Sequence, residues 1–272
     1  MDLGAYFARI GYSGPRAPDL ATLTALTTRH VASVPFDNLD VQLGRPVTIG
    51  LDAAFAKLVG ARRGGWCFEQ NGLFGCALGE LGFSVRRIAA GVMRAERGDA
   101  ALGNHLALIV TLEGADWLVD VGFGGSQARP IPLAEGEHPH SPYRIRLVRL
   151  GNGYWRLSEW TDPAKPFSFD FAGTPADEAL LAAKCEALQV SAESPFVQNL
   201  VVQQRHGDTH LSLRGRVLVE KSAAYETRRL IESADDLVET IATRFGMDVP
   251  EVAGLWERVR ERHEALFPSQ GA

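Results

Sequence analysis

Cys67 is the residue of this chain whose setting points most directly to chemistry. It follows Arg62-Arg63-Gly64-Gly65-Trp66, where a glycine-rich turn runs into an expected helix. A helix N-terminus and nearby cations both stabilise a thiolate, which is the reactive form of cysteine. Cys67 is therefore a candidate nucleophile, provided that the fold brings a base to it.

A base and a partner for it occur in two apolar segments further along the chain. His105 precedes the apolar run 106–110, and Asp120 lies within the run 117–121. Burying either side chain is costly unless it is hydrogen-bonded, and each would satisfy the other. An aspartate that accepts from one imidazole nitrogen orients the ring and leaves the second nitrogen to take the thiol proton. We therefore expect Cys67, His105 and Asp120 to form a catalytic triad.

The two runs are expected to form a β-hairpin. If the turn occupies residues 113–116, Leu112 pairs with Trp117, and Asp120 faces Ile109 on the same side as His105. This register leaves Asp120 and His105 displaced along the sheet. A bulge or a different turn is needed to close that gap.

The remaining six histidines are weaker candidates for the base. His30 falls on an early helix, where we expect partial burial. We expect the other five at the solvated surface, and these are His138, His140, His206, His210 and His263.

The first third of the chain is predicted to be helical. Asp19 is expected to cap a helix that ends at Pro35, and Asp52 a second helix that ends at Gly60. A third helix is expected from Cys67 to Leu81. From about Ser84 the pattern changes to strands, with hairpins at 106–121 and 143–160, so the middle third is predicted to be an antiparallel sheet or small barrel.

The last third mixes helices and strands. A connecting helix is expected at 180–188, followed by strands at 200–204, 210–213 and 216–220, and Ser233 is expected to cap a closing helix. We therefore divide this α+β chain into a helical bundle (1–83), a barrel (84–176), a connecting segment (177–199) and an α/β lid (200–272).

The composition and net charge argue against several classes of binding partner. The net charge of −5 over 272 residues argues against a nucleic-acid binder, and no apolar stretch is long enough to span a bilayer. The first residues lack the basic and apolar regions of a secretion signal. Three cysteines without metal-ligand spacing indicate free thiols in the cytoplasm and no metal site, while the oligomeric state stays open.

The segment from Arg63 to Phe74, which reads RGGWCFEQNGLF, closely resembles the active-site segment of the prokaryotic arylamine N-acetyltransferases. His105 and the segment from Asp120 to Gly124 resemble the other two triad segments of that family, in the same order. Segments 6–12, 34–39 and 194–199 also look familial, so the resemblance spans most of the chain.

This resemblance implies an N-terminal helical bundle, a β-barrel and an α/β lid around a papain-like site. It also implies a ping-pong reaction in which Cys67 takes an acetyl group from acetyl-CoA and passes it to an arylamine, arylhydrazine or arylhydroxylamine. By the same resemblance, one set of residues would contact coenzyme A: Asn104, Gly122, Phe123, Gly124, Gly125 and Ser126. The acceptor would meet Phe36, Phe123 and Phe196.

Two positions depart from the family pattern. Asp37 stands where relatives carry Glu, and Asn104 stands where relatives often carry Thr. Three other functions remain open: a papain-like or transglutaminase-like cysteine enzyme, an amide synthase built on the same fold, and a binding protein with a vestigial triad. The protease signature Cys-Gly-Ser/Ala-Cys-Trp/Tyr is absent, and a binding protein would need no intact triad.

Overall fold

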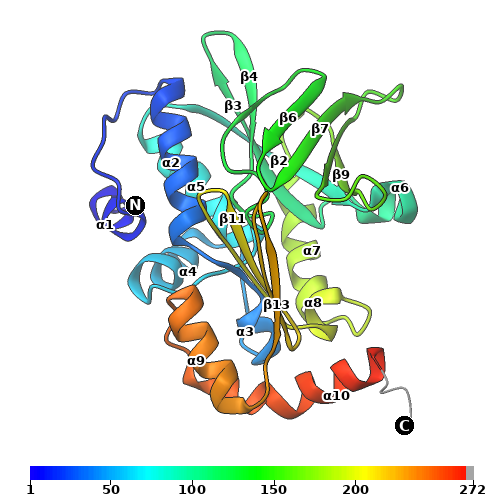
Figure 1. The fold of residues 1–272 in the computed structure, drawn as a ribbon. Coiled ribbons are helices and arrows are strands. Elements are labelled where there is room, and N and C mark those ends of the chain that lie inside the picture. The colour runs from blue at the N-terminus through cyan, green and yellow to red at the C-terminus, as the bar shows by residue number, and fades with distance from the viewer. Residues whose placement is uncertain (268–272) are drawn as a thin grey trace.

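The computed structural model describes residues 1–267 and has the three-part α+β architecture expected from the sequence. Figure 1 shows the N-terminal helices beside an antiparallel barrel, with the C-terminal sheet and helices below them. The middle and C-terminal parts are each built around one antiparallel sheet, of eight and five strands.

The N-terminal part contains five α-helices among the described residues: α1 (Leu3–Ile10), α2 (Leu20–Ser33), α3 (Leu39–Gln42), α4 (Leu51–Phe55) and α5 (Cys67–Glu80). Asp19 caps α2 as expected, because its carboxylate accepts from Thr22 N at 2.7 Å. The expectation for Asp52 is wrong. Helix α4 begins after Gly50, and Asp52 lies inside its first turn, where a carboxylate faces the positive end of the helix dipole without capping it. The helix then widens into a π-helical turn, η1 (Ala56–Gly60).

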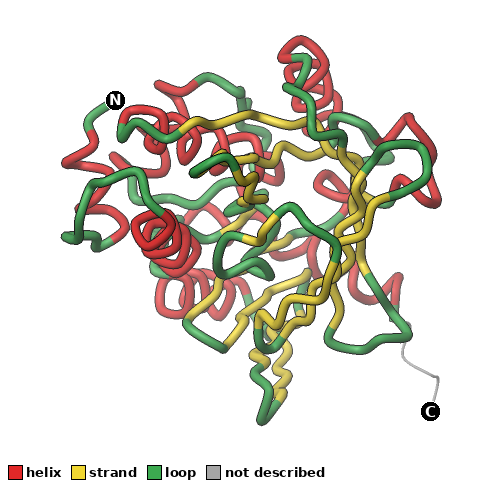
Figure 2. Tube along the Cα trace, turned by 90° about the horizontal axis from the view of Figure 1, so that it is seen from above, coloured by secondary structure: helices red, strands yellow, loops and turns green. Residues whose placement is uncertain are grey.

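The eight-stranded sheet forms the barrel, and Figure 2 shows its strands curling around one another. The strand order is β5 (Ile131–Pro132), β4 (Ala115–Val119), β3 (His105–Leu112), β2 (Ser84–Val92), β9 (Phe167–Phe171), β8 (Trp155–Trp160), β7 (Tyr143–Arg149) and β6 (Gly136–His140). The two predicted hairpins are confirmed as β3–β4 and β7–β8. The short helices α6 (Arg94–Arg97) and η2 (Gly98–Ala101) connect β2 to β3.

The register of the β3–β4 hairpin differs from the expected one by two residues. Its turn is Glu113-Gly114 alone, so Leu112 pairs with Ala115 and Leu108 with Val119. Both turn residues have positive φ, 50° and 81°, as a type I′ hairpin requires. Continued by one residue, this register sets Asp120 opposite Ala107, which is diagonal to His105. The tighter turn therefore closes the gap without a bulge.

The C-terminal part, which is expected from the sequence to be an α/β lid, is built around the second sheet. Helices α7 (Glu178–Val190) and α8 (Pro195–Gln198) lead into the second sheet, whose order is β1 (Phe36–Asp37), β10 (Val201–His206), β11 (Thr209–Arg214), β12 (Val217–Lys221) and β13 (Glu226–Leu230). Helix α9 (Ala234–Phe245), η3 (Pro250–Leu255) and α10 (Trp256–Leu266) pack on it. Ser233 caps α9 by accepting from Asp236 N at 3.1 Å, as expected. Strand β1 comes from the N-terminal part and joins the lid sheet beside β10.

Successive side chains of β3 point to opposite faces and pack into two different apolar cores. Leu108 and Val110 pack with the N-terminal helices, whereas Ala107 and Ile109 face the barrel interior. His105 shares parity with the barrel-facing residues, while α5 packs on the opposite face of the strand. Within residues 1–267, no helix has the length and apolar character needed to cross a membrane.

Candidate active site

Cys67 is the first residue of α5 and is only 3% exposed. At this position its backbone lies at the positive end of the helix dipole, as the sequence predicts. Contrary to the expectation from the sequence, the two arginines before Cys67 do not supply unpaired positive charge to its thiol. Arg62 is exposed, and the Arg63 guanidinium donates to Asp40 Oδ1 at 2.9 Å, so its charge is already paired.

His105 and Asp120 meet directly. His105 Nε2 donates to Asp120 Oδ2 at 2.6 Å, and both side chains are 2% exposed. The other carboxylate oxygen, Asp120 Oδ1, accepts from Gly122 N at 2.9 Å and from Asn71 Nδ2 at 2.8 Å. The carboxylate is therefore fixed from three sides, and Nδ1 of His105 is left for the thiol.

The electrostatics favour a charged imidazole. Burial lowers the pKa of His105, but the negative charges of Asp120 and Cys67 and their hydrogen bonds outweigh burial and raise it from 6.5 to about 10. An imidazolium at neutral pH is the proper partner for a thiolate. The pair can then act as nucleophile and proton carrier.

Asn71 is a site residue that the sequence analysis missed. Besides holding Asp120, its amide donates to Leu106 O at 2.7 Å and accepts from Val121 N at 3.0 Å. It thus ties α5 to β3, which carries His105, and to the residues just after β4, which include Asp120. Its spacing of four residues from Cys67 places both on one helix face, which was the available signal.

A cavity of about 310 Å³ opens onto the triad, and both Cys67 and His105 line it. Five residues proposed from the sequence also line it: Phe36, Asn104, Gly122, Phe123 and Phe196. The sequence analysis missed Phe167, Arg97 and Arg214, which line the same cavity. Neither arginine forms an ion pair with any residue that the structure describes.

Two clusters of aromatic rings contribute to the lining of the cavity. Phe123 lies 5.0 Å from the His105 ring and stacks on Phe167 at 5.4 Å, with 14° between the planes. Phe196 packs edge-on against Trp66 at 5.4 Å and lies 6.2 Å from Phe36. Aromatic rings of this kind offer flat apolar faces on which another ring can stack.

A family model described as N-acetyltransferase matches residues 19–253. The arylamine N-acetyltransferase of Mycolicibacterium smegmatis is 40% identical over 264 residues, covering 93% of this chain and 94% of that protein. That of Mycobacterium tuberculosis is 37% identical, covering 93% and 91%.

Solved structures agree with the sequence comparison. Mycobacterium marinum arylamine N-acetyltransferase in complex with CoA superposes with a TM-score of 0.85 at 32% identity, covering 96% of this chain and 98% of that one. The chain belongs to the arylamine N-acetyltransferase family. This confirms the resemblance seen in the sequence, and with it the enzyme class of an acyltransferase.

The glycine-rich loop after Asp120 (residues 122–126) reaches the cavity only with its first two residues. Gly122 and Phe123 line the cavity, whereas Gly124, Gly125 and Ser126 do not. The lid holds this second half of the loop: His210 Nε2 donates to Gly124 O at 2.7 Å, and Arg205 donates to Ser126 O at 3.0 Å.

Three histidines are more deeply buried than expected from the sequence. His210 and His140 are buried rather than solvated, because His210 binds the loop and His140 Nδ1 accepts from Ala128 N at 3.0 Å. His30 is fully buried, with its ring nitrogens near Tyr6 Oη at 2.8 Å and Gln70 Oε1 at 3.3 Å.

Both departures from the family pattern contact the backbone, but Asp37 does so through one oxygen only, and its buried Oδ2 has no hydrogen-bond partner among the described residues. Asn104 Oδ1 accepts from Val92 N at 2.8 Å and its amide donates to Val92 O at 3.2 Å, which fastens the end of β2. Asp37 Oδ1 accepts from Leu39 N at 2.9 Å. Within residues 1–267, no group of three His, Cys, Asp or Glu side chains could hold a metal ion.

Proposed function

We propose that this enzyme transfers an acetyl group from acetyl-CoA to the nitrogen of arylamines, arylhydrazines or arylhydroxylamines, through a thioester on Cys67. The observation that carries the proposal is the cavity lined by both Cys67 and His105, with His105 held from behind by Asp120 at 2.6 Å. The relatives named above are acetyltransferases rather than peptidases.

In the first half-reaction the Cys67 thiolate attacks the carbonyl carbon of acetyl-CoA. The tetrahedral intermediate collapses as its bond to the CoA sulfur breaks, and the departing sulfur takes the proton from His105. A thiolate suits this step because it is both a good nucleophile and a good leaving group. The products are acetyl-Cys67 and free CoA, with His105 neutral.

In the second half-reaction the neutral arylamine attacks the thioester. His105 accepts the proton that the amine nitrogen loses, and the Cys67 thiolate leaves, so that the starting ion pair is restored. Because arylamines are weakly basic, they reach the site neutral, whereas an alkyl amine such as lysine is mostly protonated at neutral pH.

Backbone N–H groups at the start of α5 are the proposed oxyanion donors. The first N–H groups of a helix have no acceptor within the helix, and that of Cys67 lies beside the reacting sulfur. Fixed donors of this kind stabilise the charge that develops on the thioester oxygen.

The remaining contacts are assigned from the cavity lining. We assign Phe36, Phe123 and Phe196 to the acceptor ring and Asn104 to the entrance used by CoA. Within the segment from Gly122 to Ser126 only Gly122 and Phe123 line the cavity, and we assign their backbone to the CoA pyrophosphate, because glycine permits close approach. Arg97 and Arg214 supply positive charge for the CoA phosphates.

The proposal includes the division of the chain at residues 83, 176 and 199. Helix α5 ends at Glu80 before β2 starts, and α7 starts at Glu178 after β9 ends at Phe171, so each boundary falls between elements. The free state of all three cysteines supports a cytoplasmic location.

Isotope exchange tests the ping-pong reaction. The enzyme is incubated with acetyl-CoA and isotopically labelled CoA, without any acceptor. Because acetylation of Cys67 is reversible, label is expected in acetyl-CoA, and Cys67→Ala is expected to abolish the exchange. An enzyme that acetylates arylamines but catalyses no exchange would contradict the thioester pathway.

A further inference from the structure

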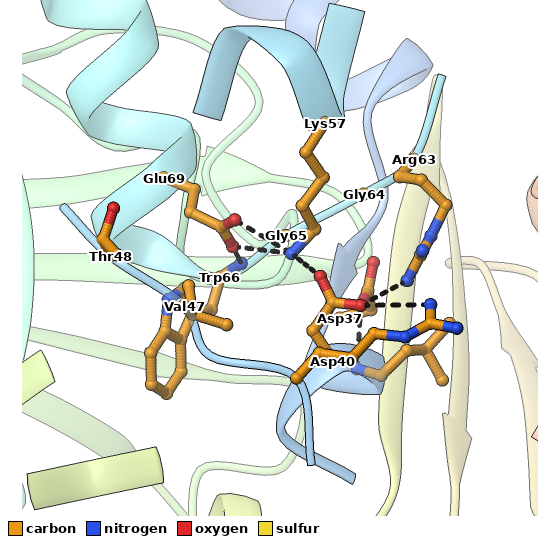
Figure 3. Close-up of polar contacts among 12 residues, drawn as sticks. Asp37, Asp40, Val47, Thr48, Lys57, Arg63, Gly64, Gly65, Trp66 and Glu69 are labelled. Atoms are coloured by element: carbon orange, nitrogen blue, oxygen red, sulfur yellow. Dashed lines mark hydrogen bonds and ion pairs between the residues drawn. The ribbon is translucent and has the colours of Figure 1, made fainter. Parts of the chain in front are cut away.

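A network of charged side chains lies beside the turn of Gly64 and Gly65 that leads into α5 (Figure 3). Lys57 pairs with both Glu69 and Asp40, and Arg63 and the more exposed Arg45 also pair with Asp40. The buried carboxylate of Asp37 lies close to these charges. None of these groups lines the catalytic cavity. Burying several charges is costly, even when they are paired with one another.

Glu69 connects the network to the nucleophile. It is the third residue of α5, and its Oε2 accepts from Trp66 N at 3.2 Å, immediately before Cys67. Lys57 Nζ donates to both carboxylate oxygens, at 2.9 and 3.0 Å. With Glu69 only 4% exposed, Lys57 supplies the charge that keeps this carboxylate in place.

The other end of the network holds the residue at the start of the turn. Lys57 Nζ lies 2.8 Å from Asp40 Oδ2, and the Arg63 guanidinium donates to Asp40 Oδ1 at 2.9 Å. Arg63, through Asp40, and Trp66, through Glu69, are therefore both hydrogen-bonded to one connected set of charges. Only the two glycines of the turn lie between them.

The glycines fit closely against these carboxylates. A Cβ at Gly65 would lie 2.5 Å from Glu69 Oε2, and one at Gly64 would lie 2.3 Å from Asp37 Oδ2. The turn thus rests on the carboxylates with no intervening side chain. A shift of the carboxylates would be passed directly to the backbone that leads into Cys67.

Lys57 projects from the π-helical turn η1. Such turns are rare and occur often at functional sites. Burial disfavours the ammonium, but the surrounding carboxylates outweigh it and raise the pKa of Lys57, so the side chain stays charged.

We propose that Lys57 and Glu69 are positioning residues for the nucleophile, whose ion pair holds the turn at residues 63–66 and thereby sets Cys67 for attack. The inference rests on the proposed function, because it concerns the geometry of Cys67 acylation. Neither residue lines the catalytic cavity.

The network has a consequence for pH dependence. Burial outweighs the pull of Lys57 and raises the pKa of Glu69 from 4.5 to about 7. The charges that face Glu69 are Lys57 on η1 and Asp37 on β1, with the thiol of Cys185 on α7 also near. As the pH falls below 7, Glu69 takes a proton and its ion pair with Lys57 weakens, so acylation is expected to slow.

The test measures Cys67 acylation in a single turnover, with acetyl-CoA as the probe and rapid mixing as the method. Glu69→Gln removes the charge but keeps an oxygen for Trp66 N, and Lys57→Met removes the cation. The matched control is Lys221→Met, which breaks the pair with Glu226 (2.9 Å) far along the chain in the lid. Thermal unfolding is recorded for every variant.

We expect both site variants to acylate at least ~10-fold more slowly, since small displacements of a reacting group are expensive, with KM for acetyl-CoA unchanged. The control is expected to keep the wild-type rate. Wild type is expected to lose rate as the pH falls through 7, and Glu69→Gln is expected to lack this inflection.

Wild-type acylation rates in folded Glu69→Gln would overturn the proposal, as would an unchanged inflection near pH 7 in that variant. If Lys57→Met does not fold, Glu69→Gln alone decides. If wild type itself forms no acetyl-Cys67, the proposed function fails instead. Positioning is then read from alkylation of Cys67 by iodoacetamide, where slowing in both variants supports the proposal and wild-type rates refute it.

Discussion

The contact between the loop after Asp120 and the start of α5 gives the sharpest prediction, which concerns Gly122→Ala. A Cβ at residue 122 would lie 2.6 Å from Cys67 Cα and 2.7 Å from Asn71 Nδ2. Ordinary contact begins at 3.4 Å, so the loop and the helix must separate by about 0.8 Å.

That separation acts on the triad as well as on packing. Gly122 N donates to Asp120 Oδ1 at 2.9 Å, so moving the loop also pulls the carboxylate that orients His105. A displacement of about 1 Å at a reacting group costs on the order of 100-fold in rate, and overpacking costs about 1–3 kcal/mol of stability. We expect Gly122→Ala to show both effects.

Two measurements check this prediction: single-turnover acylation by acetyl-CoA, and urea unfolding. The matched control is Gly254→Ala, because a Cβ at Gly254 meets nothing within 4 Å and its φ is not in the left-handed region. We expect the control to keep its rate and its stability. A Gly122→Ala enzyme that acylates at the wild-type rate would show that this contact does not set the geometry of the triad.

Three further predictions concern the site. Asn71→Ala leaves Leu106 O and Val121 N without partners, at about 1–3 kcal/mol each, and removes one hydrogen bond to Asp120. Stability to urea and the acylation rate are both expected to fall. A loss of stability with no loss of acylation rate in the folded enzyme would refute the orienting role. Arg214→Met is expected to raise KM for acetyl-CoA about tenfold with little change in kcat. The control Arg144→Met, which breaks an exposed ion pair with Glu137, is expected to change neither. If Arg214→Met has the wild-type KM, Arg214 does not belong to the CoA site. Because the pKa of His105 is raised from 6.5 to about 10, its charge stabilises the fold fully below pH 6.5, and this contribution disappears as the pH rises through 10. Urea unfolding of wild type and Asp120→Asn is therefore expected to converge at high pH, and a constant difference would contradict the ion pair.

The parts of the site that could be predicted from sequence are those fixed by local patterns. A glycine turn before an apolar helix places Cys67 at a helix start, and the burial cost shared by His105 and Asp120 is enough to pair these two residues. The strand pattern gives the right hairpin and the right face. Local signals suffice there because helix starts and strand parity depend on neighbouring residues.

The register of that hairpin could not be fixed in the same way. A turn of residues 113–116 is the natural expectation because glutamate rarely adopts positive φ, yet Glu113 has φ of 50°. The two-residue turn gains a backbone twist that matches the strands, and this outweighs the local preference of glutamate. The predicted side-chain parity is nevertheless correct, because the register differs by two residues.

Long-range contacts account for the rest of the differences. His210 lies beside a turn in the sequence, but the lid sheet folds over the loop at residues 122–126 and buries it. Lys57 projects from the π-helical turn η1 and meets Glu69 on α5, and no residue pattern in the chain signals that turn. Such partners become visible only when distant segments are packed together.

The central claim is that Cys67 carries the acetyl group between donor and acceptor, and one measurement tests it most directly. The enzyme is mixed with acetyl-CoA without acceptor, quenched at successive times and digested, and the acetyl group is located by mass spectrometry. We predict one acetyl group on Cys67, formed at least as fast as turnover and released as acetylarylamine when an arylamine is added. Turnover without acetyl-Cys67, or an acetyl-Cys67 that the amine cannot discharge, would contradict the claim.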